Sequence, residues 1–96
     1  MTVYAVLYEY ADDPAVAEHR PSHRAFLAAL HEEGTLLTSG PFADAGGPGA
    51  LLLLRGDSEQ TVRDLLREDP FQQQGLVESV TVREWAPVFG PWAELG

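Results

Sequence analysis

Four consecutive leucines, Leu51–Leu54, are the feature that most restricts how this chain can fold. They predict a strand over residues 50–55, between the turn-rich segment Asp44–Gly49 and Gly56. Side chains along a strand point alternately to opposite faces, so an uninterrupted apolar run makes both of its faces apolar. We therefore expect the sheet that contains this strand to be covered on both sides.

Three further strands are predicted around the leucine run. Residues 3–8 are rich in β-branched and aromatic side chains, residues 36–39 form a short apolar segment that ends at Gly40-Pro41, and residues 77–85 alternate in polarity. Such segments, bounded by glycine and proline, are typical of strands. Both faces of the first strand carry large side chains, with Val3, Ala5 and Leu7 on one and the tyrosines on the other.

Two helices are predicted between these strands. Asp13-Pro14 is typical of a helix start, but we expect Pro21 to interrupt that helix, so that the main helix begins near residues 20–22 and ends at Gly34. The second helix is expected to begin after Asp57 or Ser58 and to end at Asp69, because a proline follows. Its apolar stripe consists of Val62, Leu65 and Leu66.

The resulting order, β-α-β-β-α-β, predicts an α+β fold of the ferredoxin-like type. In this fold a four-stranded antiparallel sheet carries both helices on one face. We expect residues 1–87 to form this domain and residues 88–96 to form a C-terminal tail.

The second face of the predicted sheet needs a cover that two helices cannot provide. A second copy of the chain, packed sheet to sheet in a homodimer, is the simplest cover. The alternative is the tail, which carries Phe89 and Trp92. A tail of nine residues is short for a four-stranded sheet, which favours the homodimer.

Charge and cysteine content exclude several functions. The 96 residues carry 15 acidic and 6 basic side chains, a net charge of −9, which argues against binding to nucleic acid. No cysteine is present, so disulfides and thiolate chemistry are excluded.

No apolar run is long enough to span a membrane, and the N-terminus lacks the basic region of a signal peptide, so we expect a cytoplasmic protein. We expect no metal and no cofactor, since His19, His23 and His31 do not form a convincing ligand set.

His23 and Asp69 are the residues best suited to chemistry. His23 shares a helix face with Leu27 and Leu30, and Asp69 continues the apolar stripe of the second helix, so both side chains are expected to point inward. Helices of this fold lie side by side, and a carboxylate beside an imidazole makes a candidate general base. Each residue also has a plain structural explanation: His23 bonded to a main-chain carbonyl, and Asp69 capping the turn at Pro70-Phe71.

Weaker candidates surround this pair. Arg20 lies one turn before His23 and is suited to an anionic group, although a surface arginine is the commoner outcome. Ser39-Gly40 ends a strand, where glycine permits a ligand to approach the backbone. A simple transition from strand to turn explains these two residues equally well.

Several short motifs, in their order and spacing, resemble the YciI-like (YCII-related) family. They are Arg20-Pro21-Ser22-His23, Ser39-Gly40-Pro41 and Asp69-Pro70-Phe71, followed by Glu78–Val82. The family is similar to the dimeric α+β barrel proteins, and the resemblance implies a His–Asp pair in a cleft at His23 and Asp69. One branch of the family eliminates chloride from a chlorinated hydroxyhydroquinone without a cofactor. The short loop Ala43–Gly49 departs from the commonest pattern, so the resemblance does not transfer a substrate.

Two functions follow as hypotheses. The first is a cofactor-independent lyase or isomerase in which His23 moves a proton on a small, possibly aromatic, molecule and Asp69 orients its ring. Arg20 would steady an oxyanion, Ser39 and Gly40 would bind substrate, and the pocket walls would be Phe71, Tyr8 and Phe42. The second is a non-catalytic small-molecule-binding or accessory module, in which the same pair fixes a ligand or satisfies buried polarity.

Overall fold

A computed structural model describes residues 2–95 as one four-stranded antiparallel sheet with helices packed on it. The elements, in chain order, are β1 (Thr2–Tyr10), α1 (Ala15–Glu32), β2 (Leu36–Pro41), β3 (Gly49–Gly56), α2 (Glu59–Leu66), α3 (Pro70–Gln73), β4 (Val77–Trp85) and the 3-10 helix η1 (Ala93–Leu95). The strand order is β2-β3-β1-β4, with every neighbouring pair antiparallel. The predicted ferredoxin-like α+β fold is confirmed.

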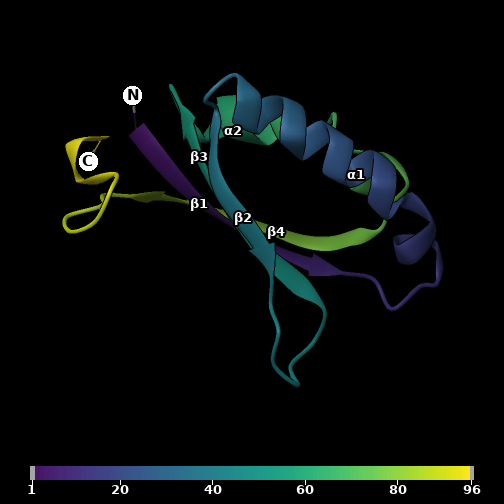
Figure 1. Cartoon of the computed structure of the whole chain (residues 1–96). Helices are drawn as coiled ribbons and strands as arrows, with labels where there is room; N and C mark the ends of the chain where they lie inside the picture. Colours follow the sequence, from purple (N-terminus) through teal and green to yellow (C-terminus); the bar gives the residue numbers. More distant parts are fainter. Residues whose placement is uncertain (1, 96) are drawn as a thin grey trace.

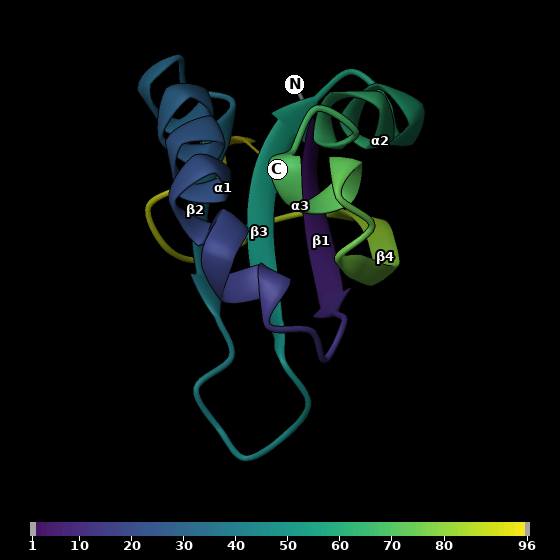
Figure 2. The same cartoon turned by 90° about the vertical axis from the view of Figure 1, so that its right-hand side faces the viewer.

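The helices all lie on one face of the sheet (Figure 1). Figure 2 looks onto this layer, with α1 on one side and α2 and α3 on the other. Alternate residues of the two central strands form the core beneath the helices, together with side chains from α1, α2 and β4. The buried strand residues of this core are Tyr4, Val6, Tyr8, Leu36, Ala50, Leu52, Leu54 and Val82.

Helix α1 is continuous through Pro21, so the predicted interruption there is wrong. Proline removes one helical hydrogen bond and costs about 3 kcal/mol in a helix interior. Packing on both sides of Pro21 offsets this cost: Val16 is buried against Phe71 and Leu76, and Leu30 is buried in the main core. At its other end α1 stops as predicted, because Gly34 adopts a positive φ of 86°.

The segment after β3 also differs from the prediction, because α2 ends at Leu66 rather than at Asp69. Ser58 caps α2, as one of the two predicted alternatives, and accepts a hydrogen bond from the Thr61 main-chain N–H. Asp69 caps the N-terminus of a separate short helix, α3, with Pro70 at its first position. The prediction that Asp69 ends the second helix is therefore wrong, because Asp69 begins the next one.

The face of the sheet away from the helices, here called the open face, is apolar but only partly covered. Val3 and Leu53 are 1% and 8% exposed, whereas Leu7 and Leu51 are each 38% exposed. The segment after β4 curls beside the beginning of β1 and leaves the other end of this face uncovered (Figure 1).

Within residues 2–95 no helix combines the length and apolar character that crossing a membrane requires.

Candidate active site

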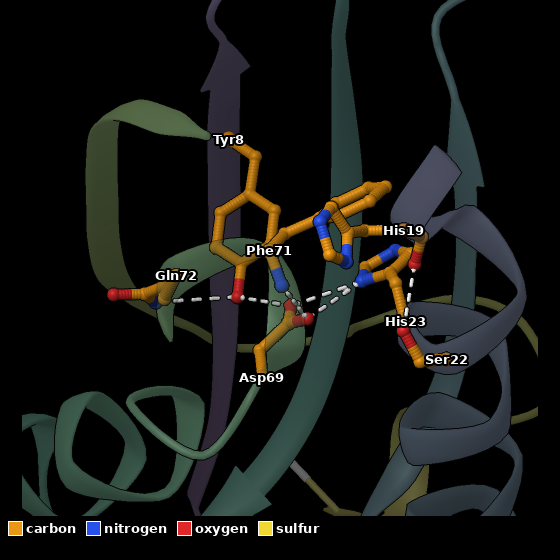
Figure 3. Close-up of polar contacts among 7 residues, drawn as sticks. All are labelled: Tyr8, His19, Ser22, His23, Asp69, Phe71 and Gln72. Atoms are coloured by element: carbon orange, nitrogen blue, oxygen red, sulfur yellow. Dashed lines mark hydrogen bonds and ion pairs between the residues drawn. The ribbon is translucent and has the colours of Figure 1, made fainter. Parts of the chain in front are cut away.

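Three elements bring a tyrosine, a histidine and an aspartate together beneath the helical layer (Figure 3). Tyr8 comes from β1, His23 from α1, and Asp69 from the residue that precedes α3. Their exposed fractions are 1%, 6% and 0%. Charged side chains are rarely buried to this degree unless they are paired, so the contacts of Asp69 decide how the site is built.

Asp69 accepts hydrogen bonds from three neighbours. The His23 Nδ1 atom lies 2.8 Å from Oδ1 and 3.0 Å from Oδ2. The Tyr8 hydroxyl donates to Oδ2 at 3.0 Å, and the Phe71 main-chain N–H donates to Oδ1 at 3.0 Å. The Phe71 bond follows from the local sequence, because an aspartate before a proline at the first helical position is a favourable N-cap. The predicted cap at Pro70-Phe71 and the predicted His23–Asp69 contact are both present, so they are not alternatives.

The Asp69 contact determines which nitrogen of His23 is free. A carboxylate can only accept, so Nδ1 carries the proton and Nε2 holds the lone pair in the neutral ring. In the described part of the chain, no hydrogen bond joins Nε2 to another protein group. Nε2 is therefore the nitrogen available to a ligand.

Aromatic rings hold the His23 imidazole in place. The Phe71 ring stacks on it, with ring centroids 3.9 Å apart and planes 8° from parallel. Tyr10 meets both rings edge-on, at 6.5 Å from His23 and 5.3 Å from Phe71. A histidine fixed by stacking on one face and by a carboxylate at Nδ1 has little rotational freedom.

A cavity of about 150 Å³ lies beside His23 and is here called the His23 cavity. Its walls come from β1, α1, the end of β2, and β3. They are Tyr10, His23, Arg24, Leu27, Ser39, Gly40, Pro41, Ala50 and Leu52. A Cβ atom at Gly40 would meet no other atom within 4 Å, so protein packing leaves room beside this residue.

The predicted site residues divide into three groups. Phe71 and Asp69 contact the imidazole and Tyr8 is bonded to Asp69, whereas Ser39 and Gly40 line the His23 cavity. Phe42 instead lines a separate hollow of about 380 Å³, here called the acidic hollow. The walls of the acidic hollow are Tyr8, Glu9, Tyr10, Asp12, Phe42, Gly47, Pro48, Gly49 and Glu78.

Arg20 is exposed and is not among the residues that line the His23 cavity. It acts on the site at longer range, since its charge opposes the rise in the pKa of Tyr10.

Three residues of the site were missed by the sequence prediction: Tyr10, Arg24 and Gln72. Tyr10 shares a strand face with Tyr8, which was a usable signal. Arg24 lies one helical turn after Arg20, and nothing in the sequence ranks one arginine above the other. Gln72 donates from Nε2 to the Tyr8 hydroxyl at 3.3 Å, a contact that depends on the separate helix α3.

Both tyrosines of the site are held in their neutral form. Burial, followed by the charge of Asp69, raises the pKa of Tyr8 far above its ordinary value. The same two causes raise the pKa of Tyr10 to about 12. Tyr8 is therefore a hydrogen-bond donor to Asp69 throughout the neutral pH range.

Residues 2–95 contain no group of three or more His, Asp or Glu side chains placed to hold a metal ion.

The fold and the site together define a ferredoxin-like α+β protein with a buried His–Asp pair between helix and sheet. The chain belongs to the YCII-related domain family, which matches residues 2–86.

Named relatives support this assignment, and a solved structure has a similar fold. Protein YciI of Escherichia coli is 35% identical over 78 residues, covering 73% of this chain and 80% of the relative. The derivative of benzaldehyde biosynthesis cluster protein C of Emericella nidulans is 32% identical over 90 residues, covering 76% of this chain and 92% of that protein. Among solved structures, 5-chloro-2-hydroxyhydroquinone dehydrochlorinase of Burkholderia phenoliruptrix, in complex with 2,5-dihydroxybenzoquinone, superposes with a TM-score of 0.64 at 22% identity, covering 85% of this chain and 92% of the other.

Proposed function

We propose that this protein is a cofactor-independent lyase or isomerase that moves a proton on a small molecule containing one ring. The observation that carries the proposal is the His23–Asp69 pair: Nδ1 is bound to a buried carboxylate, Nε2 has no protein partner among residues 2–95, and His23 lines a cavity. This is the arrangement that a general base requires.

In the proposed reaction, Nε2 takes a proton from a C–H or O–H group of the substrate. The imidazolium that forms is stabilised by the Asp69 carboxylate 2.8 Å from Nδ1. Tyr8 and the Phe71 main-chain N–H hold the carboxylate in position, and stacking on Phe71 holds the ring. In an isomerisation, His23 then gives the proton to another atom of the substrate. In an elimination, the electron pair that the proton leaves behind expels the leaving group as an anion, and His23 gives the proton to solvent.

The size of the His23 cavity supports a substrate with a single ring. An apolar cavity of about 150 Å³ in another protein accommodates benzene. The His23 cavity has about this volume, and the side chains of Leu27, Ala50 and Leu52 make part of its wall apolar. The similar fold of a dehydrochlorinase that is solved with a dihydroxybenzoquinone is compatible with this class of substrate.

Replacement of His23 tests the proposal. The screen measures chloride release from 5-chloro-2-hydroxyhydroquinone and exchange of ring protons for deuterium in hydroquinones and enolisable ketones. We expect wild-type protein to accelerate at least one of these reactions and His23→Ala to abolish the acceleration with an unchanged circular dichroism spectrum. Glu32→Ala, on the exposed end of the same helix, is the control and should retain full activity. Full activity in His23→Ala would refute the assignment.

The tautomer of His23 gives a second test that needs no substrate. Nitrogen-15 NMR at pH 8 should show a protonated Nδ1 and an unprotonated Nε2 in wild-type protein. In Asp69→Asn the side-chain amide can donate as well as accept, so we expect a mixture of tautomers. An unchanged tautomer in Asp69→Asn, or a protonated Nε2 in the wild-type protein, would contradict the proposed role of Asp69.

The alternative function is a non-catalytic binding or accessory module. It is favoured by the completeness of the buried network, in which every bond to Asp69 also serves the stability of the fold. A ring compound that binds at the His23 cavity, with no exchange or turnover in the whole screen, would favour this alternative.

We further infer that two copies of the chain pack through their open faces. Support comes from the exposure of Leu7 and Leu51 at 38% and of Trp85 at 40%, in a strand pattern that is apolar on both sides. Contiguous apolar surface of this kind commonly marks an interface. A sheet-to-sheet homodimer also agrees with the similarity of the YciI-like family to the dimeric α+β barrel proteins.

A further inference from the structure

A second hollow adjoins the His23 cavity and is here called the α1–β2 groove. Its volume is about 360 Å³. It is lined by Arg24, Leu27, Ala28, His31, Leu36, Leu37, Thr38 and Ser39. The groove and the His23 cavity share Arg24, Leu27 and Ser39, so a ligand in the cavity has the groove as its neighbour.

The helical wall of the groove follows from residue spacing. Leu27, Ala28 and His31 lie three, four and seven positions after Arg24, which places all four residues on one stripe of α1. The opposite wall is β2, an edge strand of the sheet. The stripe therefore has an apolar middle, with Arg24 at the end nearest His23 and His31 at the other.

The residues that line the α1–β2 groove and the His23 cavity differ in charge from the rest of the molecule. The chain carries 15 acidic and 6 basic side chains, yet no aspartate or glutamate lines either the groove or the His23 cavity. The acidic hollow, by contrast, is lined by Glu9, Asp12 and Glu78. The α1–β2 groove has no carboxylate in its lining and is therefore suited to an anion, whereas the Asp69 carboxylate is bonded to His23 at the cavity.

Arg24 is the cation best placed to use this property. Among residues 2–95, Arg63 and Arg67 form ion pairs with Glu59 and Asp64, whereas Arg24 forms none. Its neighbours one turn away on α1, Arg20 and Ala28, provide no carboxylate. A guanidinium without a protein partner is free to bind a carboxylate in the two-bond geometry that arginine favours.

We propose that the α1–β2 groove is the subsite for an anionic group of the substrate, bound by Arg24, and that the substrate is therefore a small ring-containing acid. Its ring occupies the His23 cavity, and its carboxylate lies at Arg24, where the two spaces meet. The proposal rests on the proposed function for the meaning of the His23 cavity. It assigns anion binding to Arg24 rather than to Arg20, the weaker candidate that the sequence analysis names for this role.

The test compares two ring compounds that differ by one carboxylate: 2,5-dihydroxybenzoate and hydroquinone. Their affinities are measured by isothermal titration calorimetry on the full chain, and the binding position is taken from NMR shifts of Leu27, Ser39 and Gly40. We expect wild-type protein to bind the acid about 10-fold more tightly, as a charge-assisted pair predicts. Arg24→Gln should lose this preference.

Two matched variants sharpen the comparison. Arg67→Gln removes an exposed arginine of α2 that is paired with Asp64, and it should retain the full preference. Arg20→Gln should retain most of it, because Arg20 does not line the cavity. If Arg20→Gln abolished the preference while Arg24→Gln kept it, the assignment to Arg24 would be wrong.

Other outcomes overturn the subsite as a whole. Equal affinity for the two compounds, a preference that survives in Arg24→Gln, or no shift at the named residues with 2,5-dihydroxybenzoate would each do so. These measurements are made at equilibrium and need no turnover. An acid preference that depends on Arg24, together with full activity in His23→Ala, would therefore leave the subsite standing and refute the catalytic proposal alone.

Discussion

The two faces of the sheet differ in the kind of side chain that they bury and expose. Under the helices, a polar group is buried completely: Asp69 is 0% exposed and receives hydrogen bonds from His23, Tyr8 and the Phe71 main chain. On the open face, apolar groups are left uncovered, with Leu7 and Leu51 each 38% exposed. The face under the helices therefore contains polar groups within the core, and the open face exposes apolar side chains to solvent.

The difference indicates where function and assembly are located. Buried polar groups normally have hydrogen-bond partners, and a network of them is stable when all are satisfied. A nitrogen that such a network leaves without a hydrogen bond therefore indicates a role beyond packing. That nitrogen is Nε2 of His23, beside the His23 cavity. An apolar open face has the simpler explanation of a surface that a second copy covers.

The largest effect is expected from removing the centre of the buried network. Asp69→Ala leaves the His23 ring, the Tyr8 hydroxyl and the Phe71 N–H without their acceptor. We expect the free energy of unfolding to fall by about 4 kcal/mol, measured by urea denaturation. Asp64→Ala, which removes an exposed carboxylate that pairs with Arg67, should cost less than about 1 kcal/mol. Similar losses in the two variants would mean that the buried network does not stabilise the fold.

The open face is tested by adding a charge to it. In Leu51→Glu each copy would bury an unpaired carboxylate against its partner, so we expect the dimer dissociation constant to rise about 100-fold, or about 3 kcal/mol. Sedimentation velocity at several concentrations measures it. Ala29→Glu places the same charge on the exposed side of α1 and should leave assembly unchanged. A wild-type protein that is monomeric at micromolar concentration would contradict the homodimer.

A smaller effect is expected from the edge of the buried network. Tyr8→Phe removes one donor to Asp69 and the acceptor of Gln72 Nε2, while Asp69 keeps its bonds to His23 and Phe71. We expect a loss of about 1–2 kcal/mol in unfolding free energy and an unchanged His23 tautomer. A tautomer change in the nitrogen-15 spectrum would show that Tyr8 orients the pair as well as stabilising it.

The fold was predictable because its determinants are local and repeated. The leucine run, the alternation of β4 and the stripe Val62–Leu66 each specify an element by periodicity, and the order of elements then leaves few topologies. The apolar faces of the two predicted helices also indicated that His23 and Asp69 point inward, toward each other. Pro21 was misread because a local rule was applied without the packing of Val16, which the sequence does not display.

The structure around Asp69 was harder to predict, although one signal was available. Asp69-Pro70 has the same pattern as Asp13-Pro14, which was interpreted as a helix start, whereas the second Asp-Pro was interpreted as a helix end. The choice between Arg20 and Arg24 could not be made from sequence. It depends on which side of α1 faces the edge strand β2, and therefore on the three-dimensional packing.

The smallest predicted effect concerns Tyr10, which lies between the His23 cavity and the acidic hollow. Burial raises its pKa from 10.0 to about 12 in the folded protein. Its contribution to stability is therefore fully present below pH 10 and is lost as the pH rises from 10 to 12, because the unfolded state loses the proton first. We expect this loss to be about 1 kcal/mol, allowing for the partial exposure of the ring. Urea unfolding at pH 9, 10 and 11 should show a shallower decline in Tyr10→Phe than in wild-type protein. Equal slopes would mean that the Tyr10 ring is solvated, and the boundary between the His23 cavity and the acidic hollow would then be open.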